Sequence, residues 1–170
     1  EITAEDLGRT QLYQAAEART QLRENSTDLD GYLSDLAMKL TWRSFDQIGL
    51  QRIVQLINKT NQFNLTTRRY REDEVVEAMA APDTMTLQIR LADKFADHGM
   101  IAVIMGKKVE GRLEIDTWLM SCRVLGRGVE EACGNLVMEH AHRMGASSVT
   151  GLYKPTAKNE MVAQHYAKLG

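Results

Sequence analysis

Side chains alternate in polarity across the middle of this 170-residue chain, and this pattern constrains the fold more than any other feature. Met85, Leu87, Ile89 and Leu91 are separated by single polar residues. A continuous apolar run follows over 99–105, and the alternation returns over 113–119. A period of two places successive side chains on opposite faces of a β-strand. With turn signals at 97–99 and 110–111, the three segments predict an antiparallel meander.

Other elements are predicted on both sides of the meander. Before it, apolar spacing predicts helices at 4–25, 28–36, 44–57 and 70–80 and a half-buried strand at 38–42. The first and third helices begin with possible capping boxes, Thr3 with Asp6 and Ser44 with Gln47. After it, the pattern predicts a helix from Val129 to a Gly145 cap, a strand at 147–153 and a helix at 159–168. This order predicts an α/β (α+β) fold with a central mixed sheet flanked by helices.

Charge and composition exclude several classes of protein. Twenty-one Lys and Arg against 23 Asp and Glu exclude a bulk electrostatic nucleic-acid binder, though not a local basic patch. No apolar run approaches 18 residues, so no membrane association is expected. Two cysteines without a CxxC motif indicate a reducing, cytoplasmic setting. The four histidines are scattered, and no metal site is predicted.

The junction between the third meander strand and the next helix carries the clearest motif, R-x-x-G-x-G, at Arg123, Gly126 and Gly128. Glycines let backbone N–H groups approach a ligand, and a helix N-terminus favours anions. Arg127 adds a second positive charge. The motif is neither a Walker loop nor a dinucleotide fingerprint, because Gly-Lys-Ser/Thr is absent and Glu131 holds the third glycine position. It predicts either a seat for a pyrophosphate or phosphopantetheine, or a plain strand-to-helix turn.

The strand, glycine loop and helix, followed by Asn159 and Tyr166, resemble the GNAT acyltransferase superfamily. The resemblance implies a GNAT-like fold in which the loop holds the pyrophosphate of an acyl-CoA. Asn159 and Tyr166 would then lie near the pantetheine and the leaving thiol. The implied cofactor-binding residues are Arg123, Val124, Leu125, Gly126, Arg127, Gly128, Asn159 and Tyr166.

Three longer segments, 56–70, 116–127 and 153–159, are similar to the C-terminal region of FkbH-like proteins. These proteins fuse a phosphatase of the haloacid-dehalogenase type to a GNAT-like domain in polyketide pathways. The resemblance implies that a glyceryl group from 1,3-bisphosphoglycerate passes through an enzyme cysteine to the phosphopantetheine thiol of an acyl carrier protein. No cofactor would be tightly bound in this domain itself. Residues 1–35 would be a helical linker from the phosphatase domain, and 36–170 the acyltransferase domain.

Cys122 is the candidate nucleophile. It stands at a predicted strand end, before a helix N-terminus and beside two arginines, and such surroundings favour the thiolate. A buried core position is the alternative that the sequence alone favours; the FkbH-like resemblance reverses that preference. Cys133 falls on the apolar side of its helix and is predicted to be core. His165 is the best placed histidine for a catalytic role beside the thiol, although any one histidine is more often structural.

The polar run 58–67 and one strand carboxylate are the candidate substrate-binding residues. Amides and hydroxyls can hydrogen-bond a glyceryl group or pantetheine amides, but they also serve ordinary turns. Asp116 could order the loop or polarise a ligand hydroxyl, but a plain surface carboxylate is the alternative that the sequence favours. The candidates are Asn61, Gln62, Asn64, Thr67 and Asp116. Lys154 and Lys158 would add a basic rim suited to an acidic carrier protein.

Two other functions stay open at this point. One is an acyl-CoA-dependent N-acetyltransferase, which would need no cysteine. The other is a non-catalytic module that docks a carrier protein, with all chemistry in the phosphatase domain.

Overall fold

The structure is a computed structural model that describes residues 4–25 and 29–170. It divides into two compact units, one made of Glu1–Thr41 with Arg90–Gly99 and the other of Trp42–Ile89 with Met100–Gly170. The first unit thus takes in the tip of a hairpin from the middle of the sequence. A linear border after residue 35, between a linker and an acyltransferase domain, stays a prediction.

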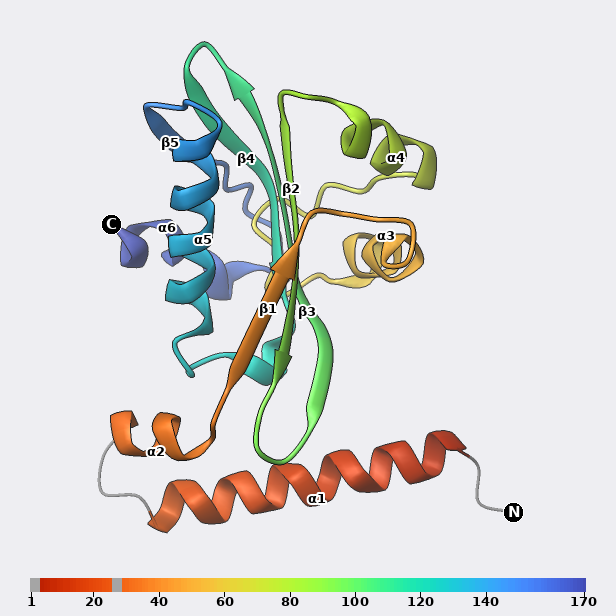
Figure 1. The fold of residues 1–170 in the computed structure, drawn as a ribbon, viewed down its shortest axis with the longest axis vertical. Coiled ribbons are helices and arrows are strands. Elements are labelled where there is room, and N and C mark those ends of the chain that lie inside the picture. The colour runs from red at the N-terminus through yellow and green to blue at the C-terminus, as the bar shows by residue number, and fades with distance from the viewer. Residues whose placement is uncertain (1–3, 26–28) are drawn as a thin grey trace. The chain divides into compact units, whose positions relative to one another are not determined.

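One five-stranded sheet carries the fold, with the strands in the order β1-β2-β3-β4-β5 (Figure 1). The strands are β1 Lys39–Arg43, β2 Thr84–Ala92, β3 Asp97–Val109, β4 Arg112–Met120 and β5 Ser148–Gly151. β3 pairs antiparallel with β4, and β4 pairs parallel with β5. The predicted meander and the mixed sheet are therefore confirmed. The half-buried character predicted for the first strand is wrong, because β1 is an edge strand and Trp42 is 47% exposed.

One of the two predicted turns in the meander is displaced. Glu110 and Gly111 form the β3–β4 turn, with φ of 50° and 82°. Residues 97–99, in contrast, already belong to β3. The β2–β3 turn lies just before them, because Asp93 Oδ1 accepts the N–H groups of Phe95 at 2.9 Å and Ala96 at 3.0 Å. The turn therefore lies where Asp93 accepts two N–H groups, and not at the glycine that follows.

Helices cover both faces of the sheet in the second unit (Figure 1). α3 (Leu50–Lys59) and α4 (Glu72–Ala80) pack on one face, where Ile53, Ile57 and Val75 meet Val103 and Leu119 in an apolar core. α5 (Val129–Arg143) lies on the other face. The capping box predicted at Ser44 and Gln47 is wrong: α3 begins at Leu50, and Asp46 Oδ1 instead accepts the N–H of Gly49 at 2.8 Å.

The last predicted helix is broken in two. A 3₁₀ turn at Glu160–Val162 is followed by the short α6, His165–Leu169. Asn159 directs its side chain away from the helix that it was expected to open, since Nδ2 donates to the carbonyl oxygens of Asn64 and Lys154, each at 2.9 Å. The fully buried Asn159 amide therefore links two loops by hydrogen bonds and does not cap a helix.

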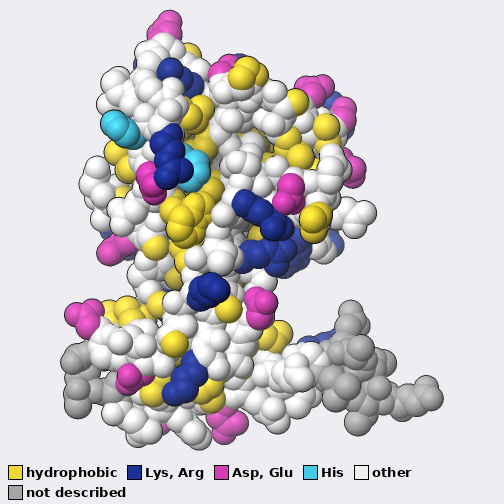
Figure 2. Space-filling model, in the orientation of Figure 1, with side chains coloured by type: hydrophobic (Ala, Val, Ile, Leu, Met, Phe, Trp, Pro, Cys, Tyr) yellow, Lys and Arg dark blue, Asp and Glu magenta, His cyan; other side chains and the backbone are white. Residues whose placement is uncertain are grey.

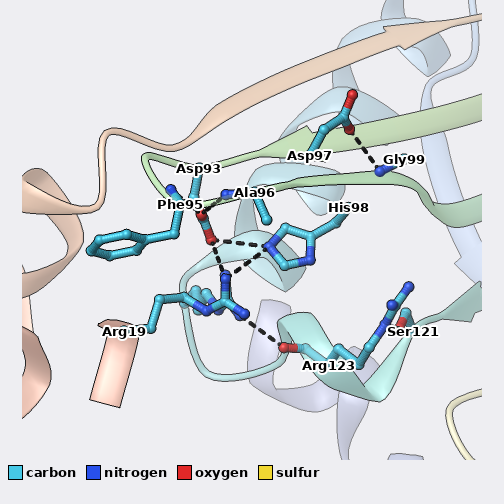
Figure 3. A network of polar contacts seen from close by, with 10 residues as sticks. Arg19, Asp93, Phe95, Ala96, Asp97, His98, Gly99, Ser121 and Arg123 are labelled. Carbon is cyan, nitrogen blue, oxygen red and sulfur yellow. Dashed lines mark hydrogen bonds and ion pairs between the residues drawn. The ribbon is translucent and has the colours of Figure 1, made fainter. Parts of the chain in front are cut away.

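The first unit contains α1 (Ala4–Asn25), α2 (Leu29–Asp35) and the tip of the β2–β3 hairpin. α1 confirms the predicted first helix, and Thr3 of its predicted capping box lies outside the described residues. Asp93 joins α1 to the hairpin, because its Oδ2 lies 3.2 Å from Arg19 and 3.0 Å from His98 Nε2 (Figure 3). Burial alone would raise the pKa of Asp93, but hydrogen bonds from His98 and two amides, with Arg19, bring it below its usual value.

No helix in the described part of the chain is long and apolar enough to cross a membrane. On the face that Figure 2 shows, basic and acidic side chains are interspersed with uncharged ones.

Candidate functional site

The end of β4 is held by the polar loop that follows α3. β4 pairs with β5 only as far as Ile115, which lies opposite Gly151. Beyond that point residues 63–65 take the place of a strand neighbour: Leu65 N donates to Trp118 O and Met120 N donates to Phe63 O, each at 3.0 Å. The loop therefore closes the gap that opens between β4 and β5, and it fixes the residues after Met120.

Cys122 lies just beyond this closed edge, at the start of a 3₁₀ turn. Its side chain is exposed, whereas Cys133 is buried in α5. Cys122 borders an open groove of about 720 Å³, which is lined by Arg52, Leu56, Lys59, Thr60, Asn61, Gln62, Phe63, Met120, Ser121, Cys122, Ala157 and Lys158. The exposed position excludes the alternative of a core cysteine.

The groove is positively charged. Arg52 and Lys59 reach it from α3, and Lys158 from the segment before Asn159. None of the described residues that line it carries a carboxylate. Among residues 4–25 and 29–170, none of these three cations forms an ion pair with an acidic side chain. The groove therefore presents three uncompensated positive charges around one thiol.

Two predicted substrate-binding residues line this groove. Cys122 Sγ lies 3.6 Å from Gln62 Oε1, within hydrogen-bonding range for sulfur. Asn61 Oδ1 accepts a hydrogen bond from Arg69. The structure thus brings Gln62 to the thiol, while Asn61 is partly engaged in holding the loop.

The other three candidates lie elsewhere and have structural partners. Asn64 is fully buried, and its Oδ1 accepts the N–H of Thr67 at 2.9 Å. Thr67 has a φ of 49°, which this hydrogen bond helps to hold. Asp116 lies 2.9 Å from Arg68 and accepts a hydrogen bond from Tyr70. None of the three lines the groove, so binding of substrate by them stays a prediction without a contact to support it.

The glycine loop has the backbone that its motif predicts, but a carboxylate occupies part of it. Gly126 and Gly128 have φ of 75° and 76°, a region that disfavours side chains, and Gly128 precedes α5 directly. The N–H of Gly126 donates to Glu130 Oε1 at 3.2 Å. The Arg127 side chain donates to the carbonyl oxygen of Arg123 at 3.0 Å, and Arg123 Nε donates to Ser121 Oγ. Some of the hydrogen-bond donors that the loop could offer an anion are therefore already bonded within the chain.

The other residues of the predicted loop site differ in exposure. Val124 is fully buried beneath the loop. Leu125 and Gly126 line a second pocket of about 350 Å³, whose remaining walls are Phe63, Glu130, Glu131, Met161, His165, Lys168 and Leu169. Two glutamates in the first turn of α5 make this pocket a poor seat for a pyrophosphate. Binding of a phosphate there stays a prediction.

His165 lies in the wall of this second pocket, inside an aromatic cluster. Its ring packs edge-on against Trp118 and Phe63, with centroid separations of 4.4 and 5.1 Å. Burial, with Lys168 nearby, lowers the pKa of His165 to about 4, so the ring is neutral at pH 7. Nε2 has no hydrogen-bond partner among the described residues. No hydrogen bond joins His165 to Cys122 in the described structure, so a catalytic role of His165 stays a prediction.

Tyr166 completes the cluster. Its ring packs against Gly151, where an added Cβ would lie 2.2 Å from the ring, so that only glycine permits this contact. Burial and the Asp116 carboxylate raise the pKa of Tyr166 above its usual value. The hydroxyl is buried and unpaired within the described structure, which leaves it available to a ligand or a water molecule.

Sequence reasoning missed Arg52 and the grouping of Lys59 with Lys158. A signal was present, because Arg52, Leu56 and Lys59 follow the i, i+4, i+7 spacing of one helix side, next to the buried side at Ile53 and Ile57. Which face of the helix meets Cys122 depends on tertiary packing. Among the described residues no three metal-ligating side chains gather.

The comparisons with known proteins identify the fold. No family model matches the sequence, and no curated protein matches it. Solved structures do resemble this one in fold, and three of them are described here. The ribosomal-protein-S18-alanine N-acetyltransferase of Escherichia coli superposes with a TM-score of 0.55 at 14% identity, over 78% of this chain and 77% of that one.

The PaiA N-acetyltransferase of Thermoplasma acidophilum, solved with coenzyme A, gives 0.59 at 12% identity over 78% and 89% of the two chains. A GNAT-family acetyltransferase of Streptococcus pneumoniae gives 0.55 at 12% over 78% and 84%. This chain has a GNAT fold. The fold prediction is therefore confirmed, and identities this low carry no further conclusion about activity.

Proposed function

We propose that this domain is an acyltransferase that carries a glyceryl group as a thioester on Cys122 and passes it to the phosphopantetheine thiol of an acyl carrier protein. The observation that carries the proposal is the exposed Cys122 thiol in a groove with three uncompensated cations. Reactive cysteines occupy partly exposed, electropositive surroundings of this kind, whereas structural cysteines are buried.

The chemistry is two acyl transfers in sequence. The Cys122 thiolate attacks the carbonyl carbon of the donor, an acyl phosphate or a thioester, and the bond from that carbon to the phosphate or donor thiolate breaks. The carrier thiolate then attacks the new thioester, and Cys122 leaves as a thiolate. A covalent intermediate divides one difficult transfer into two easier steps. The domain holds the reacting groups close together.

The setting of the reaction follows from the FkbH-like resemblance. The parent protein would contain a phosphatase domain of the haloacid-dehalogenase type, joined through residues 1–35, and would use 1,3-bisphosphoglycerate in a cytoplasmic polyketide pathway. The only cofactor required is the phosphopantetheine of the carrier.

An acyl-CoA-dependent N-acetyltransferase is the second candidate, because two of the structures compared above are N-acetyltransferases. This reaction would leave Cys122 without a role. The Glu130 carboxylate accepts the N–H of Gly126, and it would compete for that N–H with the pyrophosphate of an acyl-CoA. This contact favours the glyceryl transferase over the N-acetyltransferase.

Intact-protein mass spectrometry tests the proposal without the phosphatase domain. Thioester exchange is reversible, so glyceryl-pantetheine thioester should acylate Cys122 directly. We expect one glyceryl adduct that hydroxylamine removes, and none on Cys122→Ser. Cys133→Ser is the matched control and should be acylated like the natural chain.

A natural chain that remains unmodified by glyceryl-pantetheine contradicts the covalent route. If it also acetylates amines from acetyl-CoA and Cys122→Ser retains that activity, the N-acetyltransferase takes its place. Carrier binding without any adduct would instead favour a docking module.

A further inference from the structure

We infer that the groove beside Cys122 recognises a phosphate group, and that Arg52, Lys59 and Lys158 form its anion-binding wall. This inference rests on the proposed function for the role of Cys122, but the wall has evidence of its own. It assigns a substrate class, phosphate-bearing acyl groups or carriers, to a groove whose other walls are uncharged.

The three cations converge from separate parts of the chain. Arg52 and Lys59 stand two helical turns apart in α3, and Lys158 comes from a loop about a hundred residues later in the sequence. An anion bound in the groove would be attracted by all three charges at once, although water and salt screen each of them. All three are exposed, so their charged groups are accessible to a ligand.

The chain contains enough carboxylates to neutralise them. It has 23 acidic residues against 21 basic ones, and carboxylates accompany many of its other cations. Arg43, Arg68 and Arg71, for example, each contact an acidic side chain. Arg52 donates only to the neutral Gln55, at 2.7 Å, and keeps further N–H groups for a ligand. Other cations of the described chain, Arg112 among them, also lack an acidic partner. What distinguishes this groove is that three such cations line it together, with no carboxylate among its described lining residues.

The chemistry of the wall suits a phosphate better than a neutral group. A guanidinium offers a planar pair of donors to two oxygens, and ammonium groups add point charges. Two sources of phosphate could reach this wall. One is the phosphate of the acyl donor, and the other is the phosphodiester that links phosphopantetheine to its carrier.

Alkylation of Cys122 measures the charge preference without requiring acyl transfer. Iodoacetate and iodoacetamide both form a C–S bond with the thiolate and release iodide, but only iodoacetate is an anion. We expect the rate ratio of iodoacetate to iodoacetamide at Cys122 to exceed that of glutathione about threefold to tenfold at low salt. The excess should decline toward the glutathione ratio at high salt.

Variants identify the cations responsible. Lys59→Gln, Arg52→Gln and Lys158→Gln should each lower the ratio about twofold, and the triple variant should abolish the excess. Arg112→Gln is the matched control, since this exposed arginine lies at the opposite end of β4 and should leave the ratio unchanged. Circular dichroism shows whether each variant is folded. The salt series on the natural chain tests the charge preference even if a variant does not fold.

Protection experiments distinguish the two sources of phosphate. 3-Phosphoglycerate or 4′-phosphopantetheine is added before iodoacetamide, and the one that slows alkylation of Cys122 identifies the source. A charge preference equal to that of glutathione, insensitive to salt and to the triple variant, overturns the inference. The glyceryl adduct on Cys122 is a separate measurement, so the proposed function can survive that result.

Discussion

The two pockets of the second unit share Phe63 as a wall residue but differ in charge. The cysteine groove has three cations and no carboxylate, whereas the pocket at the glycine loop has Glu130 and Glu131 against the single cation Lys168. The sequence motif for anion binding is R-x-x-G-x-G, and it borders the acidic pocket. The site with the charge to attract an anion lies on the other side of Phe63.

The difference shows that a phosphate motif and a phosphate site are separable. Glycines give a loop the backbone needed to approach an anion, but the neighbouring side chains decide whether an anion is attracted. In this chain Glu130 accepts the N–H of Gly126, and the three cations without an acidic partner line the other pocket, two of them from α3.

The reactivity of the two cysteines should differ most. Burial, with Glu130 nearby, raises the pKa of Cys133 to about 12, so only about one thiol in ten thousand is ionised at pH 8. We expect iodoacetamide to label Cys122 at least about a thousandfold faster than Cys133 at this pH. Peptide mapping of a time course gives both rates, and unfolding in guanidinium should make them equal. Equal rates in the folded chain would mean that the groove does not expose Cys122 selectively.

Phe63→Ala should remove the wall that the pockets share. Phe63 is 5% exposed, and truncating a buried phenylalanine costs about 3–5 kcal/mol of unfolding free energy. Phe45→Ala is the matched control, because Phe45 is 6% exposed but lines neither pocket. Urea unfolding should show a similar loss for both variants.

Only Phe63→Ala should also change the alkylation rate of Cys122. Phe63→Leu provides the same comparison at a smaller cost in stability if the alanine variant does not fold. An unchanged rate in a folded Phe63 variant would show that the side chain does not shape the groove.

Acid should destabilise the chain through His165. The folded pKa is about 4, below the ordinary 6.5, so the folded state binds fewer protons between these values. Stability from this residue is complete above pH 6.5 and is lost as the pH falls toward 4, by about 2 kcal/mol at pH 4.5. His165→Phe retains an aromatic ring without a titratable group, so the urea midpoint should fall less between pH 7 and pH 4.5. An equal fall in both proteins would mean that His165 is not buried as a neutral ring.

The sequence predicted the parts of the fold that depend on local pattern. Alternation over 85–91 and 113–119 identified the meander, and glycines at 126 and 128 marked the turn before α5. It misplaced the start of α3, because Asp46 rather than Ser44 accepts an N–H group before the helix, that of Gly49. It misjudged the form of the last helix, because Asn159 hydrogen-bonds to Asn64, which only folding brings near.

The site was predicted less completely, for the same reason. Cys122 and Gln62 were both singled out, and the structure places them 3.6 Å apart. Asn64 and Thr67 were selected for their polarity, yet they brace the loop itself. The charge of each pocket arises from residues distant in sequence, Lys59 with Lys158 and Glu130 with Lys168, and no local spacing reports such pairs.

Replacing Glu130 should give the smallest effect and the sharpest test of the contrast. Glu130→Gln removes the charge beside Gly126 while keeping an acceptor for its N–H. A negative charge in the first turn of a helix is worth about 0.3–1 kcal/mol, so urea unfolding should show a loss of that size. An anion brought to the loop should meanwhile bind more tightly, about threefold for 4′-phosphopantetheine measured by calorimetry.

Glu139→Gln on the last turns of α5 is the matched control for both measurements, since Glu139 pairs with Arg143 and lines neither pocket. Stability should then move in one direction and anion affinity in the other only for Glu130→Gln, because the same charge stabilises the helix and repels the ligand. If affinity does not rise while stability falls, Glu130 is an ordinary helix-terminal charge, and the glycine loop is a plain strand-to-helix turn. Lys59→Gln should shift anion binding in the opposite sense, which would place the phosphate on the cysteine side of Phe63.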